Sequence, residues 1–376
     1  MSNDNLYSNL IPLGWNQYFK EHFAPYREQG MIPGRIEREH KNLYSVAFDQ
    51  GQINAEVSGR FRNAAQSRAD FPAVGDWVAM KTSPGDGNAI IHAILPRISC
   101  FSRKAILSGG MPDTGGKTDE QVLAANIDTV FLVSGLDGDF NLRRIERYVI
   151  TAYNSGATAV IVLNKADLCD DIDERIQAVE SVAVGVPVLT LSAATGDGLD
   201  GVGQYVTVGK TIAFMGSSGV GKSTIINALL GEERLATNTV REYDSKGRHT
   251  TSHRELIVLP EGGIVIDTPG MRELQLWGDE NGLGHVFDDI ETLARQCRFD
   301  DCSHTNEPGC AVLAAIDGGQ LDRGRFANYL KLQKEIRHMQ RRKNVALSRR
   351  RERARDKRYR RFFKEMQKIN KKFQSR

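Results

Sequence analysis

Short apolar runs alternate with amphipathic helical segments through the middle of the chain, between about residues 121 and 280. The apolar runs, which have the length of buried strands, are Thr129–Val133, Ala159–Leu163, Val188–Ser192, Thr211–Met215 and Gly263–Ile266. The segments with helical spacing are Leu142–Ser155, Asp173–Val182 and Lys222–Leu230. Alternation of this kind predicts a parallel sheet covered by helices, so we expect an α/β domain over residues 121–280.

A different pattern precedes this domain. Five short strand-like runs with turn residues between them occupy residues 34–100. This is the strand number and size of an oligonucleotide-binding (OB) barrel, although any small β-domain also fits the pattern. Residues 1–33 are polar and aperiodic and form an N-terminal extension, part of which can be helical. Residues 101–120 are rich in Gly, Ser, Asp and Thr, which predicts a loop or linker.

The pattern changes again after residue 281. An acidic helical segment and a cluster of Cys and His residues occupy residues 281–330, and a basic helical tail follows over residues 331–376. The chain therefore predicts a multidomain protein with a small all-β OB-type barrel, an α/β domain, and a mainly α C-terminal region with a basic tail.

Composition narrows the class of protein. Of the 376 residues, 40% are hydrophobic and 26% are charged, as in ordinary globular proteins. The chain lacks an apolar run of about 18 residues that would predict a membrane span. Its N-terminus also lacks the basic and apolar regions of a secretory signal. The five cysteines form no disulfide framework. We expect a cytoplasmic, monomeric protein with no membrane partner.

The net charge of +3 hides a strong asymmetry. Residues 331–376 contain 20 Lys and Arg against 4 Asp and Glu, a net charge of +16, whereas the other 330 residues carry a net −13. Tyr359, Phe362, Phe363 and Phe373 are interleaved with the basic residues. An acidic body with a basic tail predicts a polyanionic partner, of which nucleic acid is the best fit; a solvated charged helix is the alternative.

A phosphate-binding loop follows the apolar run Thr211–Met215. The segment G-S-S-G-V-G-K-S fits the pattern G-x-x-x-x-G-K-[ST] and opens a helical run. Backbone N–H groups of such a loop cradle phosphate at a helix N-terminus. We expect Lys222 to reach the β- and γ-phosphates and the Ser223 hydroxyl to ligate Mg²⁺. The expected nucleotide-binding residues here are Gly216, Ser217, Ser218, Gly219, Val220, Gly221, Lys222, Ser223 and Thr224.

A second phosphate motif, D-T-P-G, ends the apolar run Gly263–Ile266. Asp267 at a strand end is expected to hold Mg²⁺ through water, and the Gly270 N–H to meet the γ-phosphate. The segment G-R-H-T-T lies between the two phosphate motifs. A threonine in this interval normally closes over Mg²⁺ and the γ-phosphate, and spacing does not choose between Thr250 and Thr251.

Two further motifs indicate that the base is guanine. Asn164-Lys165-Ala166-Asp167 fits N-K-x-D and follows the run Ala159–Leu163. The carboxylate of Asp167 can accept hydrogen bonds from the guanine ring N–H and amine, a pair that adenine does not offer. We expect Asn164 to hold the base edge and the stem of Lys165 to lie along the base. The segment Ser192-Ala193-Ala194 follows the next apolar run, and one of its backbone N–H groups is expected to meet the guanine oxygen.

The order of the motifs is rotated. Guanine motifs normally follow the phosphate motifs, but here the order is Asn164, Ser192, Gly216, Thr250, Asp267. A circular permutation preserves a fold when its termini lie close together. The second phosphate motif consequently runs almost directly into the C-terminal region, and we hypothesise that the nucleotide state is transmitted there.

The residue that positions the attacking water is not the usual glutamine. Met271 follows the D-x-x-G glycine, and an apolar side chain cannot orient water. Either another residue or a partner must do so. His249 is the local catalytic candidate, since an imidazole can orient or polarise a water; a solvated loop histidine is the alternative. We expect slow intrinsic hydrolysis that a partner accelerates.

Three cysteines and one histidine fall within 14 residues, with the spacing C-x4-C-x-H-x5-C. Three thiolates and one imidazole complete a closed tetrahedral shell, which predicts one structural zinc ion. The ligands would be Cys297, Cys302, His304 and Cys310.

Together these residues resemble the RsgA (YjeQ) family of circularly permuted GTPases, which assist maturation of the small ribosomal subunit. The resemblance covers nearly the whole chain, and its most specific segments are GSSGVGKST, GRHTT, DTPG, NKAD and the Cys/His cluster. It implies a barrel that contacts ribosomal RNA, GTP hydrolysis stimulated by the small subunit, and release of the factor late in assembly. Within the resemblance, His249 matches the family's proposed catalytic histidine and Met271 its apolar replacement. The tail is long and basic for the family.

Two rival functions remain open from the sequence. One is a nucleic-acid-binding regulator that uses GTP as a switch without a ribosomal role. The other is a P-loop kinase, which the N-K-x-D motif disfavours because it selects guanine.

Overall fold

The structure is a computed structural model that describes residues 6–40, 43–82, 87–106, 118–235, 254–267 and 281–341, together with Ser348 and Arg355. Some predicted features lie outside these residues, namely His249, Thr250, Thr251, Gly270, Met271 and most of the basic tail. Within the described ranges, none of the helices combines the length and the apolarity that a bilayer span requires.

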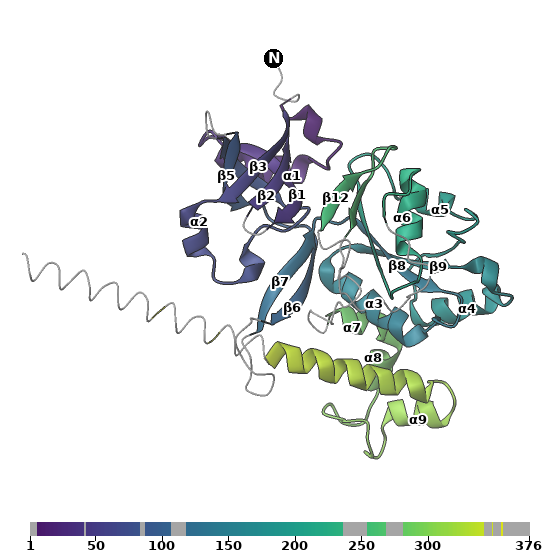
Figure 1. The fold of residues 1–376 in the computed structure, drawn as a ribbon. Coiled ribbons are helices and arrows are strands. Elements are labelled where there is room, and N and C mark those ends of the chain that lie inside the picture. The colour runs from purple at the N-terminus through teal and green to yellow at the C-terminus, as the bar shows by residue number, and fades with distance from the viewer. Residues whose placement is uncertain are drawn as a thin grey trace, which may run out of the picture.

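Five strands close into a barrel in the N-terminal part of the chain (Figure 1), as predicted. They are β1 (Ile32–His40), β2 (Leu43–Phe48), β3 (Gly51–Val57), β4 (Trp77–Thr82) and β5 (Asn88–Ile94). The strands pair in the order β1-β2-β3-β5-β4, and β4 returns to β1. The pairing of β3 with β5 is parallel and the others are antiparallel. Between β3 and β4 lie the short helices α2 (Gly59–Ala64) and η3 (Arg68–Asp70).

The N-terminal segment is part of the barrel's packing. It contains η2 (Ser8–Leu10) and α1 (Gln17–Arg27), which begins where the Asn16 side chain accepts a hydrogen bond from the Phe19 N–H at 3.3 Å. Trp15, Phe19 and Phe23 are at most 3% exposed and share a core with Trp77 of β4. The sequence predicted a polar extension here. Its aromatic residues nevertheless recur every four positions, which is the signal of a helix face packed against a core.

The two strands of a β-hairpin occupy both ends of the segment that was predicted as a linker over residues 101–120. β6 (Cys100–Ile106) and β7 (Thr118–Ala125) pair antiparallel. Residues 107–117 between them lie outside the described residues. The hairpin contacts the segment that leads into β4, because the Ala125 N–H donates to the Val74 carbonyl at 3.0 Å. Turn-type residues dominated the composition of this segment and masked the strands on either side.

Six strands form the sheet of the α/β domain. They are β8 (Thr129–Gly135), β9 (Thr158–Asn164), β10 (Val188–Thr190), β11 (Thr211–Gly216), β12 (Glu255–Val258) and β13 (Ile264–Asp267). They lie in the order β10-β9-β8-β11-β13-β12. The five strands other than β12 run parallel, which confirms the predicted parallel sheet. The sequence did not predict β12, which is antiparallel to β13.

Helices cover both faces of this sheet. Strand β8 shows the alternation, because Leu132 packs in the same core as Ile145 of α3, whereas Val133 packs in the other core with Ile225 of α6. On the first face lie α3 (Leu142–Ser155) and α4 (Ile172–Val182), and on the second lie α5 (Asp200–Gly203) and α6 (Lys222–Leu230). A short η5 (Ala166–Leu168) follows β9. Strands with two buried faces explain the continuous apolar runs in the sequence.

The β1–β12 pairing and the buried Arg35 both join the barrel to the α/β sheet. Arg38 of β1 pairs with Glu255 of β12, so that all eleven strands form one hydrogen-bonded sheet. Beside this pairing lies Arg35, whose side chain is buried and donates to the carbonyl oxygens of Leu13, Gly75 and Asn126 and to the Thr211 hydroxyl. Because Thr211 begins β11, Arg35 connects the barrel to the strand that leads into the phosphate loop.

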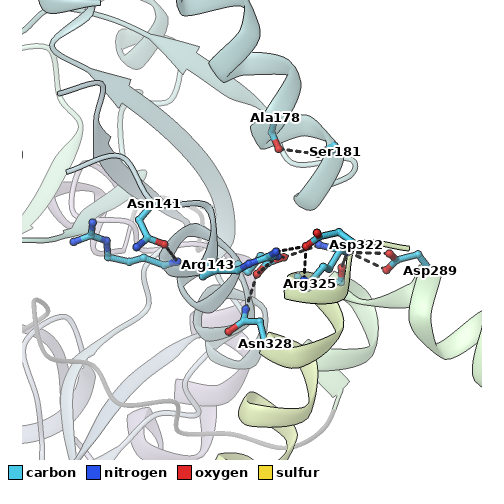
Figure 2. Close-up of polar contacts among 11 residues, drawn as sticks. Asn141, Arg143, Ala178, Ser181, Asp289, Asp322, Arg325 and Asn328 are labelled. Carbon is cyan, nitrogen blue, oxygen red and sulfur yellow. Dashed lines mark hydrogen bonds and ion pairs between the residues drawn. The ribbon is translucent and has the colours of Figure 1, made fainter. Parts of the chain in front are cut away.

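The C-terminal region is mainly helical, as predicted. It comprises α7 (Asn281–Val286), α8 (Asp288–Ala294), α9 (Ala311–Asp317) and a helix over residues 323–341 (Figure 1). Figure 2 shows polar contacts that dock it against α3. Glu146 of α3 is fully buried and accepts from Arg325 at 2.6 Å and from Asn328 at 2.5 Å. Arg325 also donates twice to Asp289 of α8, each at 2.9 Å. These bonds fix the C-terminal helices to the α/β domain.

Candidate functional site

The phosphate loop lies between β11 and α6, where the sequence predicted it. Its glycines are required by space and by backbone conformation. A Cβ on Gly216 would lie 2.4 Å from the Val133 carbonyl oxygen, and one on Gly221 would lie 2.1 Å from the Asn164 amide nitrogen. Gly219 and Gly221 also have positive φ angles of 77° and 99°, a region that favours glycine. The backbone between β11 and α6 can therefore turn its N–H groups toward an anion at the helix N-terminus.

Lys222 is the first residue of α6. Its ammonium donates to the carbonyl oxygens of Gly216, at 2.8 Å, and Ser217. Both acceptors belong to the phosphate loop, so the positive charge of Lys222 lies beside the loop that would bind phosphate. Ser223 and Thr224 follow in the first turn of α6, where both are half-buried.

Asp267 ends β13, which pairs in parallel with β11. Parallel neighbours end at the same edge of a sheet, so Asp267 and the phosphate loop lie at one edge. A serine hydroxyl and a carboxylate at this edge are the hard oxygen donors that Mg²⁺ prefers. The residue types and their placement therefore fit the ion.

Asn164 connects the phosphate loop to the guanine motifs. The residue is 2% exposed; its side-chain nitrogen donates to the Val220 carbonyl at 2.8 Å and its side-chain oxygen accepts from the Ala193 N–H at 2.9 Å. The sequence predicted contact between Asn164 and the base edge. In the structure this amide holds together three segments that are far apart in the chain, and its contact with the base edge stays a prediction.

The other residues of the N-K-x-D motif differ in exposure: Ala166 packs against the apolar core, Lys165 is half-buried and Asp167 is exposed. Lys165 has a left-handed backbone (φ 67°), and its ammonium lies 2.6 Å from the Asp137 carboxylate. Burial alone would raise the pKa of Asp137, but the hydrogen bond from Lys165 leaves it below its ordinary value. Asp167 lies in η5 and is exposed, so its carboxylate is accessible to a guanine base.

The Ser192 segment forms the adjacent turn. Ser192 is buried, and its hydroxyl accepts from the Thr195 N–H at 3.3 Å. Since the Ala193 N–H is bonded to Asn164, the next N–H, that of the exposed Ala194, is the better placed to meet a guanine oxygen.

The Cys/His cluster is assembled in the C-terminal region. The ligand atoms of Cys297, Cys302, His304 and Cys310 all lie within 4.8 Å of one another. The Cys297 and Cys310 sulfurs are 3.9 Å apart, and His304 Nδ1 lies 3.6 Å from the first and 3.4 Å from the second. Zinc bond lengths in a regular tetrahedron give about 3.8 Å between sulfurs and about 3.5 Å between sulfur and nitrogen. The four residues therefore form a group that could hold a metal ion, with spacings that fit zinc.

Two carboxylates at the nucleotide site were missed from the sequence. Asp137 and Asp139 lie in the 136–141 loop between β8 and α3. Asp137 pairs with Lys165, and Asp139 accepts a hydrogen bond from the Ser217 hydroxyl of the phosphate loop. Neither residue belongs to one of the GTPase motifs recognised in the sequence. Their position directly after an apolar strand of the parallel sheet was the available signal.

Comparison with known proteins agrees with this geometry. The family model described as RsgA GTPase matches residues 96–277, and one described as 50S ribosome-binding GTPase matches residues 211–346. The chain is 48% identical over 349 residues to the small ribosomal subunit biogenesis GTPase RsgA of Opitutus terrae, with 90% of this chain and 93% of the relative covered. It is 50% identical over 311 residues to the RsgA 2 protein of Lactiplantibacillus plantarum, with 82% and 85% covered.

Two solved structures are similar in fold. The crystal structure of YjeQ from Thermotoga maritima has a TM-score of 0.57 and 28% identity, with 81% of this chain and 98% of that chain covered. YloQ, described as a circularly permuted GTPase, has a TM-score of 0.56 and 25% identity, with 82% and 96% covered. The rotated motifs lie at one edge of the sheet, and the relatives match this chain at high identity over most of its length. The chain therefore belongs to the RsgA family of circularly permuted GTPases.

Proposed function

We propose that this protein hydrolyses GTP on the small ribosomal subunit and couples hydrolysis to late maturation of the subunit and to its own release. The observation that carries the proposal is the joining of phosphate loop and guanine motif through Asn164. It occurs in a chain 48% identical to a protein named for small ribosomal subunit biogenesis. Ribosomal RNA is the polyanion proposed for the barrel and the basic tail.

The reaction follows from the residues at the sheet edge. The phosphate-loop N–H groups and Lys222 bind the β- and γ-phosphates and offset the charge that develops on them. Asp167 and the backbone after Ser192 select guanine. We assign Mg²⁺ to Ser223 and Asp267, together with Thr250 or Thr251; bound there, the ion would neutralise charge on the β- and γ-phosphate oxygens. Gly270 is proposed to contact the γ-phosphate.

The attacking water is assigned to His249. Met271 cannot orient a water, whereas an imidazole can accept a proton or a hydrogen bond from it. The subunit is proposed to complete this arrangement, so we expect slow hydrolysis by the protein alone. The Cys/His cluster is proposed to hold one zinc ion with a purely structural role, because its four ligands leave no open position.

Replacement of the base-reading carboxylate tests nucleotide selection. We expect Asp167→Asn to weaken GTP binding about 100-fold, because an amide cannot accept both guanine hydrogen bonds. Xanthosine triphosphate should bind the variant better than the wild type, since its second carbonyl accepts from the new amide. Competition binding measures both effects, with Asp170→Asn, on an exposed residue nearby, as the matched control. Equal GTP affinity in variant and wild type would remove Asp167 from the site.

The ribosomal partner is tested separately by binding. We expect the protein with a GTP analogue to bind purified small subunits much more tightly than duplex RNA of equal charge at about 0.15 M salt. Phosphate contacts alone depend steeply on salt and do not distinguish the two polyanions. A preference for small subunits that persists as salt rises supports the proposal. Equal affinity for both at every salt concentration would favour a general nucleic-acid-binding regulator.

A further inference from the structure

The 136–141 loop between β8 and α3 contacts both halves of the nucleotide site. Asp137 pairs with Lys165 of the guanine motif at 2.6 Å. Asp139 accepts a hydrogen bond from the Ser217 hydroxyl of the phosphate loop. The two acids are connected, because the Asp139 N–H donates to the Asp137 carboxylate at 3.1 Å. We propose that Asp139 is a positioning residue for GTP binding, which fixes the phosphate loop through Ser217. The inference rests on the proposed function.

Asp139 carries a negative charge close to the loop that is expected to bind phosphate. A carboxylate beside a loop that binds a triphosphate repels the ligand unless it is neutralised. Arg144, in the first turn of α3, supplies the neutralising charge: its guanidinium lies 2.9 Å from Asp139 Oδ1 and also donates to the Asp139 backbone carbonyl. The Asp139 carboxylate therefore forms an ion pair with Arg144 and at the same time accepts a hydrogen bond from Ser217.

The hydrogen bond from Ser217 to Asp139 can affect phosphate binding, because Ser217 is part of the phosphate loop. Its carbonyl oxygen accepts from the Lys222 ammonium, the group expected to meet the β- and γ-phosphates. Its hydroxyl is taken by Asp139. Fixing Ser217 fixes the backbone that both presents N–H groups and seats Lys222. Pre-organisation of this kind lowers the entropy lost when the ligand binds.

Arg144, which pairs with Asp139, belongs to α3, and α3 is itself bonded to the C-terminal helices. Arg143, adjacent to Arg144, donates to Asp322 at 2.6 Å and to the buried Glu146 at 3.1 Å. Figure 2 shows these bonds converging with those of Arg325 from the C-terminal helix. Consecutive arginines at the start of α3 thus connect the phosphate loop to the C-terminal helices.

Binding of fluorescent GDP and GTP to four forms of the protein tests the inference: wild type, Asp139→Asn, Ser217→Ala and the double variant. We expect each single change to weaken binding of both nucleotides about five- to twenty-fold, as loss of a charge-assisted hydrogen bond would. The double variant should be no more than about two-fold weaker than the worse single variant, because both changes remove the same contact.

A charge effect alone predicts the opposite sign. If Asp139 merely repelled phosphate, Asp139→Asn would tighten binding, and that result would overturn the inference. Fold losses that multiply in the double variant would overturn it as well. Asp139→Glu retains the charge and should restore part of the lost affinity, which a damaged fold would not allow; thermal melting of each variant checks folding. Asp170→Asn should bind as the wild type does. If the wild type itself bound neither nucleotide, the proposed function would fail rather than this inference.

Discussion

Removal of the metal is expected to unfold the loop of residues 297–310 and leave the nucleotide domain folded. Most of its residues between the four ligands are exposed. The Glu307 carboxylate also stabilises the loop by accepting from the N–H groups of Ser303 and Thr305, but hydrogen bonds exposed to water contribute far less than a structural metal. Structural zinc contributes roughly 10–16 kcal/mol of apparent binding free energy in small sites. The loop cannot replace that with apolar burial. The N-terminus of α9 should loosen too, since the Leu313 N–H donates to the Cys310 sulfur at 3.4 Å.

Hydrogen exchange measures this region by region, in protein treated with a strong chelator and in Cys302→Ser. Residues 297–310 should lose protection, whereas β11 and α6 should keep theirs. The helix over residues 323–341 should remain docked, because Arg325 and Asn328 bind Glu146 independently of the metal. Cys169→Ser, outside the cluster, is the matched control. Full protection of the loop after complete metal removal would show that the cluster is not a structural metal site.

Replacement of Arg35 by methionine should destabilise the protein by about 3–5 kcal/mol, because several buried acceptors would lose a charge-assisted hydrogen bond. Methionine fills similar volume but donates no hydrogen bond. The carbonyl oxygens of Leu13 and Asn126 and the Thr211 hydroxyl would lose the Arg35 donor at the junction of barrel and nucleotide domain. The Gly75 carbonyl would keep only the Asn126 amide. Burial lowers the pKa of Arg35 to about 10, so the side chain remains charged at neutral pH.

Urea unfolding followed by tryptophan fluorescence suits this test, because Trp77 lies beside the guanidinium, whose carbon is 5.6 Å from the ring centroid. Arg38→Met is the matched control on the same strand. Its side chain is 42% exposed and pairs with Glu255, and exposed pairs contribute at most about 1 kcal/mol. Equal midpoints for the two variants would contradict the role assigned to Arg35.

Elements that local signals define were predictable from the sequence. The predicted bounds of α3 and α6 match the structure. The side chain of Asn141 caps α3 at its start, and glycines with positive φ angles, Gly156 and Gly231, end α3 and α6. The metal cluster was predictable for a related reason: its ligands lie close together in the chain as well as in space.

Features that depend on distant partners were not predictable. β12 is four residues long and is recognisable only through its pairing with β13 and β1. Asn164 was identified as part of a motif, but its bonds to Val220 and Ala193 join positions 56 and 29 residues away. A lone sequence contains no record of such pairs. The rival functions, a regulator without a ribosomal role and a kinase, are not favoured by the relatives.

The most direct test of the account is GTP hydrolysis with and without purified small ribosomal subunits, for the wild type and for His249→Ala. We expect strong stimulation of the wild type by subunits and little or none of the variant, because His249 is assigned to the attacking water. Stimulation that survives in the variant would preserve the ribosomal function and remove the histidine from catalysis. Wild-type hydrolysis that subunits leave unchanged at several salt concentrations would contradict the central claim.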